Sequence, residues 1–520
     1  MNPLASTKCA SRVLMALAAM TSIFLTIGCG SGGNPIIIGK GGFSNASLSG
    51  SYAYTLKGYG LNAGSSTVAG FFVEGGVFTA DGKGNITAAT DDFVEQVGLG
   101  TQSILGTALT GTYSISRDGT GSLQFKSGST PFELFAITLS NTGDLYMEEA
   151  DGGGTSAGSA LLQDSGQLTV TPSGTFVFRT HDVQVSSTIG AMAISAGAVS
   201  GSYIMVQNGT QVPTGGQPGV PDLIGAGTMN PPTGGRGTVS YTVNGIAHSA
   251  QYYVVSVNKF LLLDTTTLAN ILSVGSAEKQ SNVAFSAASL SGSYAFGSSG
   301  ETASPGFINT VGVFTADGSS NIAETYDFVQ DGHVTNNASA AWTYLINSDG
   351  SGTFSLGNTI QRDIWMVSPT RAYFIALNGT NVEDGTIDLQ SGTFTNTSLS
   401  TQAAFFMDGF NWNGVVFNGI SDVAFEDRVG TLVPSGSNTL GTNYLASFFA
   451  PNVVAGATNS LALTGTYAVA SNGRTTAQLT DNSGDSLGVV LYLTSNSTGY
   501  VLQSDAGFNM SGTFAAQPAP

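Results

Sequence analysis

Few side chains in this sequence could perform hydrolytic chemistry, and one motif stands out among them. Gly154-Thr155-Ser156-Ala157-Gly158 matches Gly-x-Ser-x-Gly, the pattern around a hydrolase nucleophile. That pattern works where a strand turns sharply into a helix, because the turn exposes the serine hydroxyl. Here it lies in a Gly/Ser-rich run (151–158) that predicts a loop leading into a strand. A chain with 71 glycines produces such matches by chance, so we predict no catalytic serine.

The histidines do not form a recognisable site. His181, His248 and His333 are the three in the chain, and no two of them have the spacing of zinc ligands. No thiol of the mature chain is free to complete such a site. Scattered surface or half-buried histidines are the favoured interpretation.

Three aspartate-glycine segments have a faint similarity to calcium loops. They are Asp81 to Asn85, Asp118 to Gly121 and Asp349 to Gly352. A calcium loop needs several oxygen ligands in register, ending in a bidentate acid, and none follows here. We therefore predict hairpin turns, with neither a metal nor another cofactor.

Two groups of neighbouring acids could supply the carboxylate pair of a glycosidase. One is Asp91 with Asp92, and the other is Glu148 and Glu149 with Asp151. Glycoside hydrolysis needs two carboxyl groups at a set separation across a sugar. Spacing along the chain defines no such separation or pocket, and acids at strand ends are usually solvated. We predict no catalytic residue among them.

The tryptophans could stack on sugars if they were exposed. Trp365 lies in the apolar stretch 363–367, which favours a core position, and Trp342 carries no signal of exposure. Trp412 is flanked by Asn411 and Asn413, so it is the best candidate for an exposed ring. A core position is still favoured for each.

The elements that must position these side chains are internally repeated. Ser47 to Tyr54 returns as Ser289 to Phe296, and Gly76 to Gly82 returns unchanged as Gly312 to Gly318. Such self-similarity decides the organisation of the chain. We divide it into four domain-sized units, of which the first and third are close copies: 47–164, 165–281, 286–390 and 391–516.

Within a unit the apolar residues recur with a period of two. Tyr52, Tyr54 and Leu56 alternate with small and polar residues, as do Leu123 and Phe125. This pattern predicts about seven or eight half-buried antiparallel strands per unit. The fold class is therefore all-β, as tandem antiparallel β-barrel-like domains, with a β-sandwich as the alternative. Barrels are favoured because closure removes exposed strand edges, which few charges could guard here.

Cys29 predicts how the protein is attached. An apolar run (13–27) follows Lys8 and Arg12, and Gly28-Cys29-Gly30 follows the run. This arrangement is typical of a bacterial lipoprotein signal. We expect residues 1–28 to be removed, Cys29 to be lipidated, and residues 29–46 to form a flexible tether. The partner would be a membrane, reached through the lipid anchor. Gly30 offers no acidic retention residue, which favours the outer membrane.

Composition excludes some functions. The formal net charge is −18, which argues against nucleic acid as a partner. The only cysteines are Cys9, in the predicted signal, and Cys29, so no disulfide is expected in the mature chain. Apolar residues make up 41%, enough to build cores.

The Gly-Cys-Gly motif, the Leu-Ser-Gly-Ser-Tyr-Ala-Phe opening and the Phe-Thr-Ala-Asp-Gly hairpin together resemble repeat lipoproteins of soil Acidobacteria. The resemblance implies an envelope lipoprotein and carries over no catalytic residue.

We expect a structural, adhesive or interaction role in the cell envelope, without catalysis. Its working part would be outward loops, such as 207–222 and 435–458, or the interfaces between units. Envelope glycans or proteins are the possible partners. The alternative is a binding protein for a small apolar ligand or a glycan held inside the barrels; a glycan-active or ester hydrolase is a less favoured third. Filled barrel interiors would favour the first function, and an open cavity lined by aromatic residues the second.

Overall fold

Four closed antiparallel barrels make up the computed structural model, and they follow one another along the chain. The prediction of tandem barrels is confirmed, and the sandwich alternative is wrong, since each sheet closes on itself. The described part of the chain contains no α-helix, only short 3₁₀ turns. None of these is long and apolar enough to cross a membrane. The structure describes these residues: 42–61, 69–97, 100–140, 143–151, 154–182, 186–212, 219–243, 245–266, 272–302, 306–377, 381–417, 420–450 and 453–518.

Barrels one and two occupy the first half of the chain. After a 3₁₀ turn, η1 (Asn45–Ser47), barrel one comprises β1 (Ser49–Leu61), β2 (Ala69–Asp81), β3 (Asn85–Val97), β4 (Gly100–Ile115), β5 (Thr120–Ser127), β6 (Thr130–Leu139), β7 (Leu145–Glu149) and β8 (Gly154–Leu162). Barrel two comprises β9 (Gly174–Asp182), β10 (Ser186–Ser195), β11 (Ala198–Gln207), β13 (Asp222–Met229), β14 (Arg236–Val243), β15 (Ile246–Ser256), β16 (Lys259–Asp264) and β17 (Ser273–Lys279). An added strand, β12 (Thr210–Val212), pairs with β11 beside the closed ring of strands.

Barrels three and four repeat this order. Barrel three follows η2 (Ala287–Ser289) and comprises β18 (Ser291–Thr302), β19 (Gly306–Asp317), β20 (Asn321–Gln330), β21 (His333–Ile346), β22 (Ser351–Leu356), β23 (Thr359–Ser368), β24 (Arg371–Ala376) and β25 (Asn381–Leu389). Barrel four follows η3 (Asn396–Ser398) and comprises β26 (Ala403–Phe417), β27 (Ile420–Pro434), β28 (Thr439–Ala450), β29 (Val453–Val469), β30 (Arg474–Thr480), β31 (Ser486–Ser495), β32 (Thr498–Gln503) and β33 (Phe508–Ala516).

One predicted loop is a pair of strands instead. We expected residues 435–458 to form a long variable loop, but β28 and β29 cover most of them and pair along their length. The alternation of Leu440, Tyr444 and Ala446 with polar residues explains this, because it turns one face toward the core of barrel four. Of the other predicted loop, 207–222, residues 210–212 form β12, and 213–218 lie outside the described residues.

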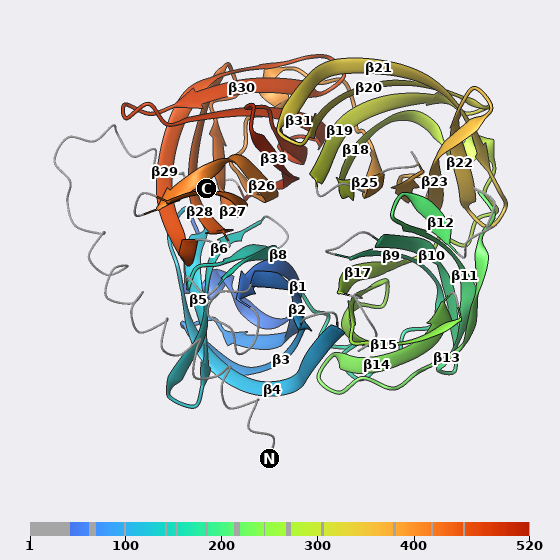
Figure 1. The fold of residues 1–520 in the computed structure, drawn as a ribbon, viewed down its shortest axis with the longest axis horizontal. Coiled ribbons are helices and arrows are strands. Elements are labelled where there is room, and N and C mark those ends of the chain that lie inside the picture. The colour runs from blue at the N-terminus through green and yellow to red at the C-terminus, as the bar shows by residue number, and fades with distance from the viewer. Residues whose placement is uncertain are drawn as a thin grey trace.

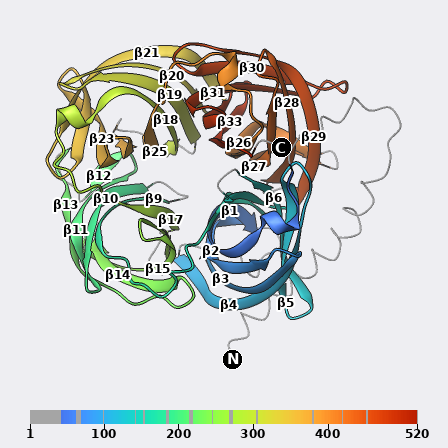
Figure 2. The same cartoon turned by 180° about the vertical axis from the view of Figure 1, so that it is seen from behind.

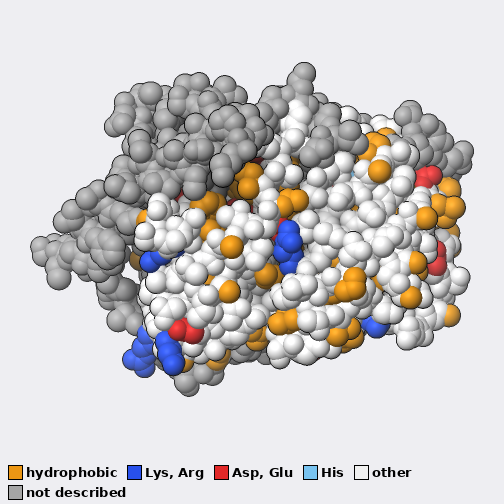
Figure 3. Space-filling view, turned by 90° about the horizontal axis from the view of Figure 1, so that it is seen from below, with side chains coloured by type: hydrophobic (Ala, Val, Ile, Leu, Met, Phe, Trp, Pro, Cys, Tyr) orange, Lys and Arg blue, Asp and Glu red, His pale blue; other side chains and the backbone are white. Residues whose placement is uncertain are grey.

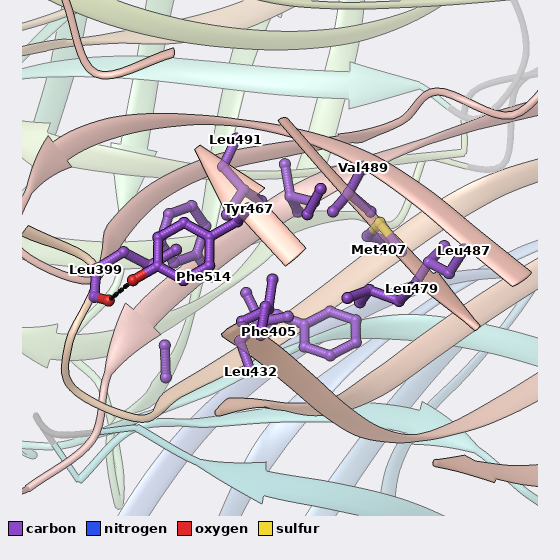
Figure 4. Close-up of a cluster of buried hydrophobic side chains, with 14 of the residues drawn as sticks. Leu399, Phe405, Met407, Leu432, Tyr467, Leu479, Leu487, Val489, Leu491 and Phe514 are labelled. Carbon is purple, nitrogen blue, oxygen red and sulfur yellow. Dashed lines mark hydrogen bonds between the residues drawn. The ribbon is translucent and has the colours of Figure 1, made fainter. Parts of the chain in front are cut away.

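Each barrel interior is filled by its own side chains. In barrel four the buried residues include Phe405, Met407, Leu491 and Phe514, drawn in Figure 4. Comparable clusters fill the other three barrels. Filled interiors of this kind form a packed core and leave no room for a ligand.

A tyrosine fixes the entry into three of the barrels. The Tyr467 hydroxyl donates to the carbonyl oxygens of Leu399 (2.8 Å) and Asn396 (2.9 Å), holding η3 against the fourth strand of barrel four. Tyr113 and Tyr344 bind η1 and η2 in the same way. The tyrosine of the Thr-Gly-Thr-Tyr and Trp-Thr-Tyr segments therefore has a structural role, which is to hold the 3₁₀ turn against its barrel.

The four barrels are arranged in a ring. Figures 1 and 2 show them at the corners of a square, with barrel four (red) beside barrel one (blue), so the last barrel in the chain lies next to the first. The first and last strands of each barrel lie toward the centre. Apolar clusters fill the interfaces of barrels one and two, two and three, and three and four. The last interface, between barrels four and one, is rich in aromatic contacts, such as Tyr59 with Phe425 at 4.4 Å.

A glutamine at the end of each barrel joins it to the next. The side-chain amide of each donates to a carbonyl on the sixth strand of the following barrel. The pairs are Gln163 with Val254 (2.5 Å), Gln280 with Met366 (2.8 Å), Gln390 with Leu493 (2.6 Å) and Gln517 with Leu139 (2.6 Å). The last pair connects barrel four to barrel one, so the same contact that links successive barrels also closes the ring.

Candidate functional site

The serine of the hydrolase-like motif lies within a strand. Gly154 to Gly158 belong to β8, so the predicted loop is wrong, and neither a sharp turn nor a helix follows Ser156. Its hydroxyl is fully buried and has no hydrogen-bond partner among the described residues. On β8, Ser156 shares the face of Ala160, which belongs to the core of barrel one, so its hydroxyl is enclosed there and cannot reach a substrate.

Glu148 is buried on the opposite face of the same sheet, because it pairs with Ala157 and not with Ser156. Its side chain on β7 is inaccessible to solvent, and β7 packs against β27 of barrel four. Burial raises the pKa of Glu148 well above its usual range, and Asp427 and Glu426 raise it further. This environment therefore favours the protonated form of Glu148. Glu149, its neighbour in the strand, points to the opposite face.

Asp91 and Asp92 separate in the same way. Asp91 accepts a hydrogen bond from Tyr54 of its own barrel (2.9 Å), whereas Asp92 contacts barrel two. Adjacent residues of a strand face opposite sides, so these two carboxylates do not form a pair.

Asp92 instead belongs to a buried network between barrels. Arg236 binds it through two hydrogen bonds, at 2.7 and 2.6 Å, and Tyr253 donates a third at 2.8 Å. Barrels three and four repeat this arrangement, with Asp327 bound by Arg474 (2.7 and 2.6 Å) and Tyr492 (2.6 Å).

His181 lies in a polar cluster between barrels two and three. Its Nδ1 is 2.5 Å from Asp384, which also pairs with Arg179 (2.9 Å) and accepts from Ser187 (2.6 Å). Burial alone would raise the pKa of Asp384, but His181 and Arg179 lower it to about 2. In a hydrolytic triad the serine approaches Nε2 while the carboxylate binds Nδ1. Here Ser187 and Asp384 both face Nδ1, which is not that geometry.

The other two histidines lie apart from this cluster. His248 is buried in barrel two, where it binds Asp264 (2.7 Å) and stacks on Tyr241. His333 is exposed at the start of β21. Among the described residues, no group of three or more His, Cys, Asp or Glu side chains is placed to hold a metal ion.

The aspartates that resemble calcium ligands form hairpin turns, as predicted. Asp81 accepts from the backbone of Lys83 and Asn85, and Asp118 from that of Thr120. Asp349 binds Ser351 in the same way. Their oxygens are occupied by the turns themselves.

Two of the tryptophans lie where barrels meet. Trp365 is 1% exposed in the interface of barrels two and three. Trp412, the candidate for exposure, is half-buried: it packs on Phe410, and its Nε1 donates to Asn509. Trp342 packs against the core of barrel three, under the guanidinium of Arg362.

The centre of the ring holds a site that the sequence did not indicate. In each barrel, a glycine on the last strand pairs with a residue of the first strand. The next residue of the first strand points its side chain into a central cavity. The glycines are Gly158, Gly275, Gly385 and Gly512, and the residues that line the cavity are Lys57, His181, Ser299 and Asp408. Four equivalent positions thus converge, and each carries different chemistry. We call them the junction residues.

The junction residues line two neighbouring spaces. On one side the junction cavity has a volume of about 300 Å³ and is lined by hydroxyls and charged side chains from all four barrels. On the other side lies a smaller pocket of about 60 Å³, whose aromatic residues are Tyr59, Phe71, Phe307 and Phe425. We call the smaller space, where these rings lie beside Glu301 and Asp427, the aromatic pocket.

Charges at the junction are paired across barrels. Lys57 of barrel one contacts Asp408 of barrel four at 2.7 Å. Burial alone would lower the pKa of Lys57, but Asp408 more than offsets this and raises it. Burial raises the pKa values of Asp427 and Glu301 well above their usual range, helped by Asp408 and Asp182 respectively. Burial thus favours the neutral forms of these two groups, and Asp427 accepts a hydrogen bond from the Thr155 hydroxyl.

A comparison of units one and three contained a signal for this site. Ser49 to Ala53 and Ser291 to Ala295 are identical, and the substitution of Ser299 for Lys57 follows shortly after them. Differing residues inside a repeated strand indicate a position that the scaffold does not need to conserve.

Surface charge is sparse elsewhere. On the face drawn in Figure 3, Lys, Arg, Asp and Glu side chains are few and separated among uncharged atoms. Residues 1–41, including Cys29, lie outside the described residues.

Comparison with known proteins adds no relationship. No family model matches the chain, and neither does any curated protein. Among solved structures, the crystal structure of the siderophore receptor PirA from Pseudomonas aeruginosa aligns with 90% of this chain and 79% of its own, at 8% identity. Its TM-score is 0.12, so nothing about this chain is inferred from it.

Proposed function

We propose that this chain is a lipid-anchored, non-enzymatic protein of the cell envelope, and that its four barrels serve as a rigid platform for interaction. The observation that carries the proposal is the closed ring, in which buried networks and glutamine contacts join every barrel to the next. A ring of this kind resists bending and holds its outer loops at fixed separations.

The distribution of reactive groups supports a role without catalysis. Ser156, which could act as a nucleophile, is buried inside barrel one, and Glu148 and Asp92, which could act as acid or base, are buried between barrels. Catalysis needs such groups within reach of a substrate. Hydrolysis of an ester or glycan by the purified protein, abolished by Ser156→Ala or Glu148→Gln, would overturn this part of the proposal.

The anchor is tested by metabolic labelling with an alkyne fatty acid. We expect label on the wild-type protein and none on Cys29→Ala, with Cys9→Ala as the matched control that keeps its label. The motif and tether around Cys29 motivate this expectation. Label that persists in Cys29→Ala would contradict it, and so would a mature protein that begins elsewhere.

A second function, small-ligand binding, is favoured by one specific observation. The barrel interiors are filled, but a cavity of about 300 Å³ lies between the barrels, near the lower end of the range for ligand sites. The alternative expected from the sequence, a ligand held inside a barrel, is therefore replaced by a ligand held at the junction of all four. Saturable binding of a small molecule, lost when the junction is blocked, tests it.

A further inference from the structure

We propose that the junction cavity binds a small, neutral, polyhydroxylated ligand of the saccharide class, with the ligand's apolar C–H face directed toward the aromatic pocket. This inference rests on the second function proposed above and specifies the ligand.

The first argument is the supply of hydroxyl groups. Side chains of Thr55, Ser159, Ser299 and Thr386 line the cavity, and they come from barrels one and three. All four are partly accessible, and none has a side-chain hydrogen bond to another described residue. A hydroxyl both donates and accepts, so it matches the hydroxyl of a polyol in either orientation.

The second argument is charge balance. Lys57, Arg179 and Lys259 line the cavity, and each is already paired: with Asp408 (2.7 Å), Asp384 (2.9 Å) and Glu278 (3.2 Å). A free anion or cation would have to compete with an existing partner in a partly buried site, where an unpaired charge is costly. A neutral polyol can bond to the remaining donors and acceptors without separating these ion pairs. Its hydrogen bonds to the charged side chains would be stronger than those between neutral groups.

The third argument is the aromatic pocket. Tyr59, Phe71, Phe307 and Phe425 line the adjoining pocket, which shares the four junction residues with the cavity. Tyr59 and Phe425 are in contact at 4.4 Å, and Phe71 and Phe307 lie edge-on to Phe425. Such a wall accepts an apolar face through dispersion and burial. Saccharides combine an apolar C–H face with a hydroxyl rim, which is the same pairing of surfaces.

The experiment is isothermal titration calorimetry of the full mature chain with neutral mono- and disaccharides: glucose, galactose, N-acetylglucosamine and maltose. Glucuronate and glucosamine serve as anionic and cationic analogues of glucose, and an anilinonaphthalene sulfonate dye serves as an apolar probe. The blocking variants are Thr386→Leu and Ser159→Leu. The matched control is Thr335→Leu, an exposed position on β21 of barrel three. Circular dichroism and thermal unfolding show which variants keep their fold.

We expect at least one neutral saccharide to bind saturably. Binding should weaken at least tenfold in a folded blocking variant and stay unchanged in Thr335→Leu. Tighter binding of a charged analogue or of the dye, lost in the blocking variants, overturns the saccharide class and keeps the small-ligand function. Saccharide binding that survives both blocking variants overturns the site. If no probe binds, both the class and the small-ligand function fail.

Discussion

Of the four interfaces in the ring, two are equivalent and two differ from each other. Barrels one and two meet through Asp92, Arg236 and Tyr253, and barrels three and four meet through the equivalent Asp327, Arg474 and Tyr492. The remaining two interfaces are unlike each other. Between barrels two and three, Asp384 forms ion pairs with both His181 and Arg179. Between barrels four and one, the equivalent position is Ala157, which has no charged side chain.

This difference indicates that a two-barrel pair is the repeated unit. The network has the same geometry in both pairs. In each, the arginine guanidinium donates two hydrogen bonds to the aspartate, at 2.7 and 2.6 Å. Between barrels two and three the contacts are mainly ionic, whereas between barrels four and one aromatic rings accompany the ion pair of Lys57 with Asp408. The variable chemistry of the molecule is thus concentrated between the pairs and at the junction.

Removing the shared carboxylate should have the largest effect on stability. Asp92→Ala and Asp327→Ala each leave a partly buried guanidinium and a buried tyrosine hydroxyl unpaired, so we expect each to lower the free energy of unfolding by about 3 kcal/mol. Urea denaturation followed by circular dichroism measures this. Asp485→Ala, at an exposed position, should change it by less than about 0.5 kcal/mol. A large loss in only one of the two variants would contradict the equivalence of the pairs.

The unlike interfaces should differ in their response to pH. Glu148, between barrels four and one, has a raised pKa when folded, because of burial and neighbouring acids. Its protonated form favours the folded state, and that contribution is lost as pH rises above about 4.5, the ordinary value for Glu. Glu148→Gln should therefore be more stable than wild type at pH 7, with a gain of at most about 1.4 kcal/mol per pH unit above that value. The gain should vanish at pH 4.

Glu278, between barrels two and three, is the matched comparison of opposite sign. Burial would raise its pKa, but Lys259 and Arg371 lower it to about 2. Its stabilising contribution is present above pH 4.5 and is lost as pH falls through 2, so Glu278→Gln should be less stable than wild type at pH 7. Unfolding curves of both variants between pH 4 and 7 measure the effect. Changes of the same sign would contradict the contrast between the two interfaces.

Loss of a glutamine contact should have the smallest effect on the free energy of unfolding, and it tests how the ring is closed. Gln517 donates to Leu139 (2.6 Å) and Asp118 (3.2 Å), and Gln163 donates to Val254 (2.5 Å). We expect Gln517→Ala and Gln163→Ala each to cost about 1 kcal/mol. Only Gln517→Ala should also increase cleavage of β6 and β33 in limited proteolysis, because no linker joins barrels four and one directly and loss of the contact exposes these two strands. Equal cleavage in both variants would show that the glutamine does not close the ring.

Much of the fold is determined locally. Alternation of apolar residues such as Tyr52, Tyr54 and Leu56, with Asp81-Gly82 and Asp317-Gly318 at strand ends, is enough to predict antiparallel strands and their hairpins. The repeats predict domain-sized units, and up-and-down order predicts closure. These features depend on neighbours in the chain, so the sequence contains them directly.

The site depends on contacts between residues far apart in the chain. Lys57 meets Asp408, and His181 meets Asp384, across separations that no motif spans. Asp92, Glu148 and Ser156 resembled exposed chemical groups in the sequence, but packing of barrel against barrel buries the first two, and the core of barrel one encloses Ser156. The sequence by itself determined strands, turns and repeats, because period and turn chemistry are local. Only the tertiary structure decided which strand faces meet at the centre, because a closed barrel leaves its outer face free to pack in more than one way until the ring forms.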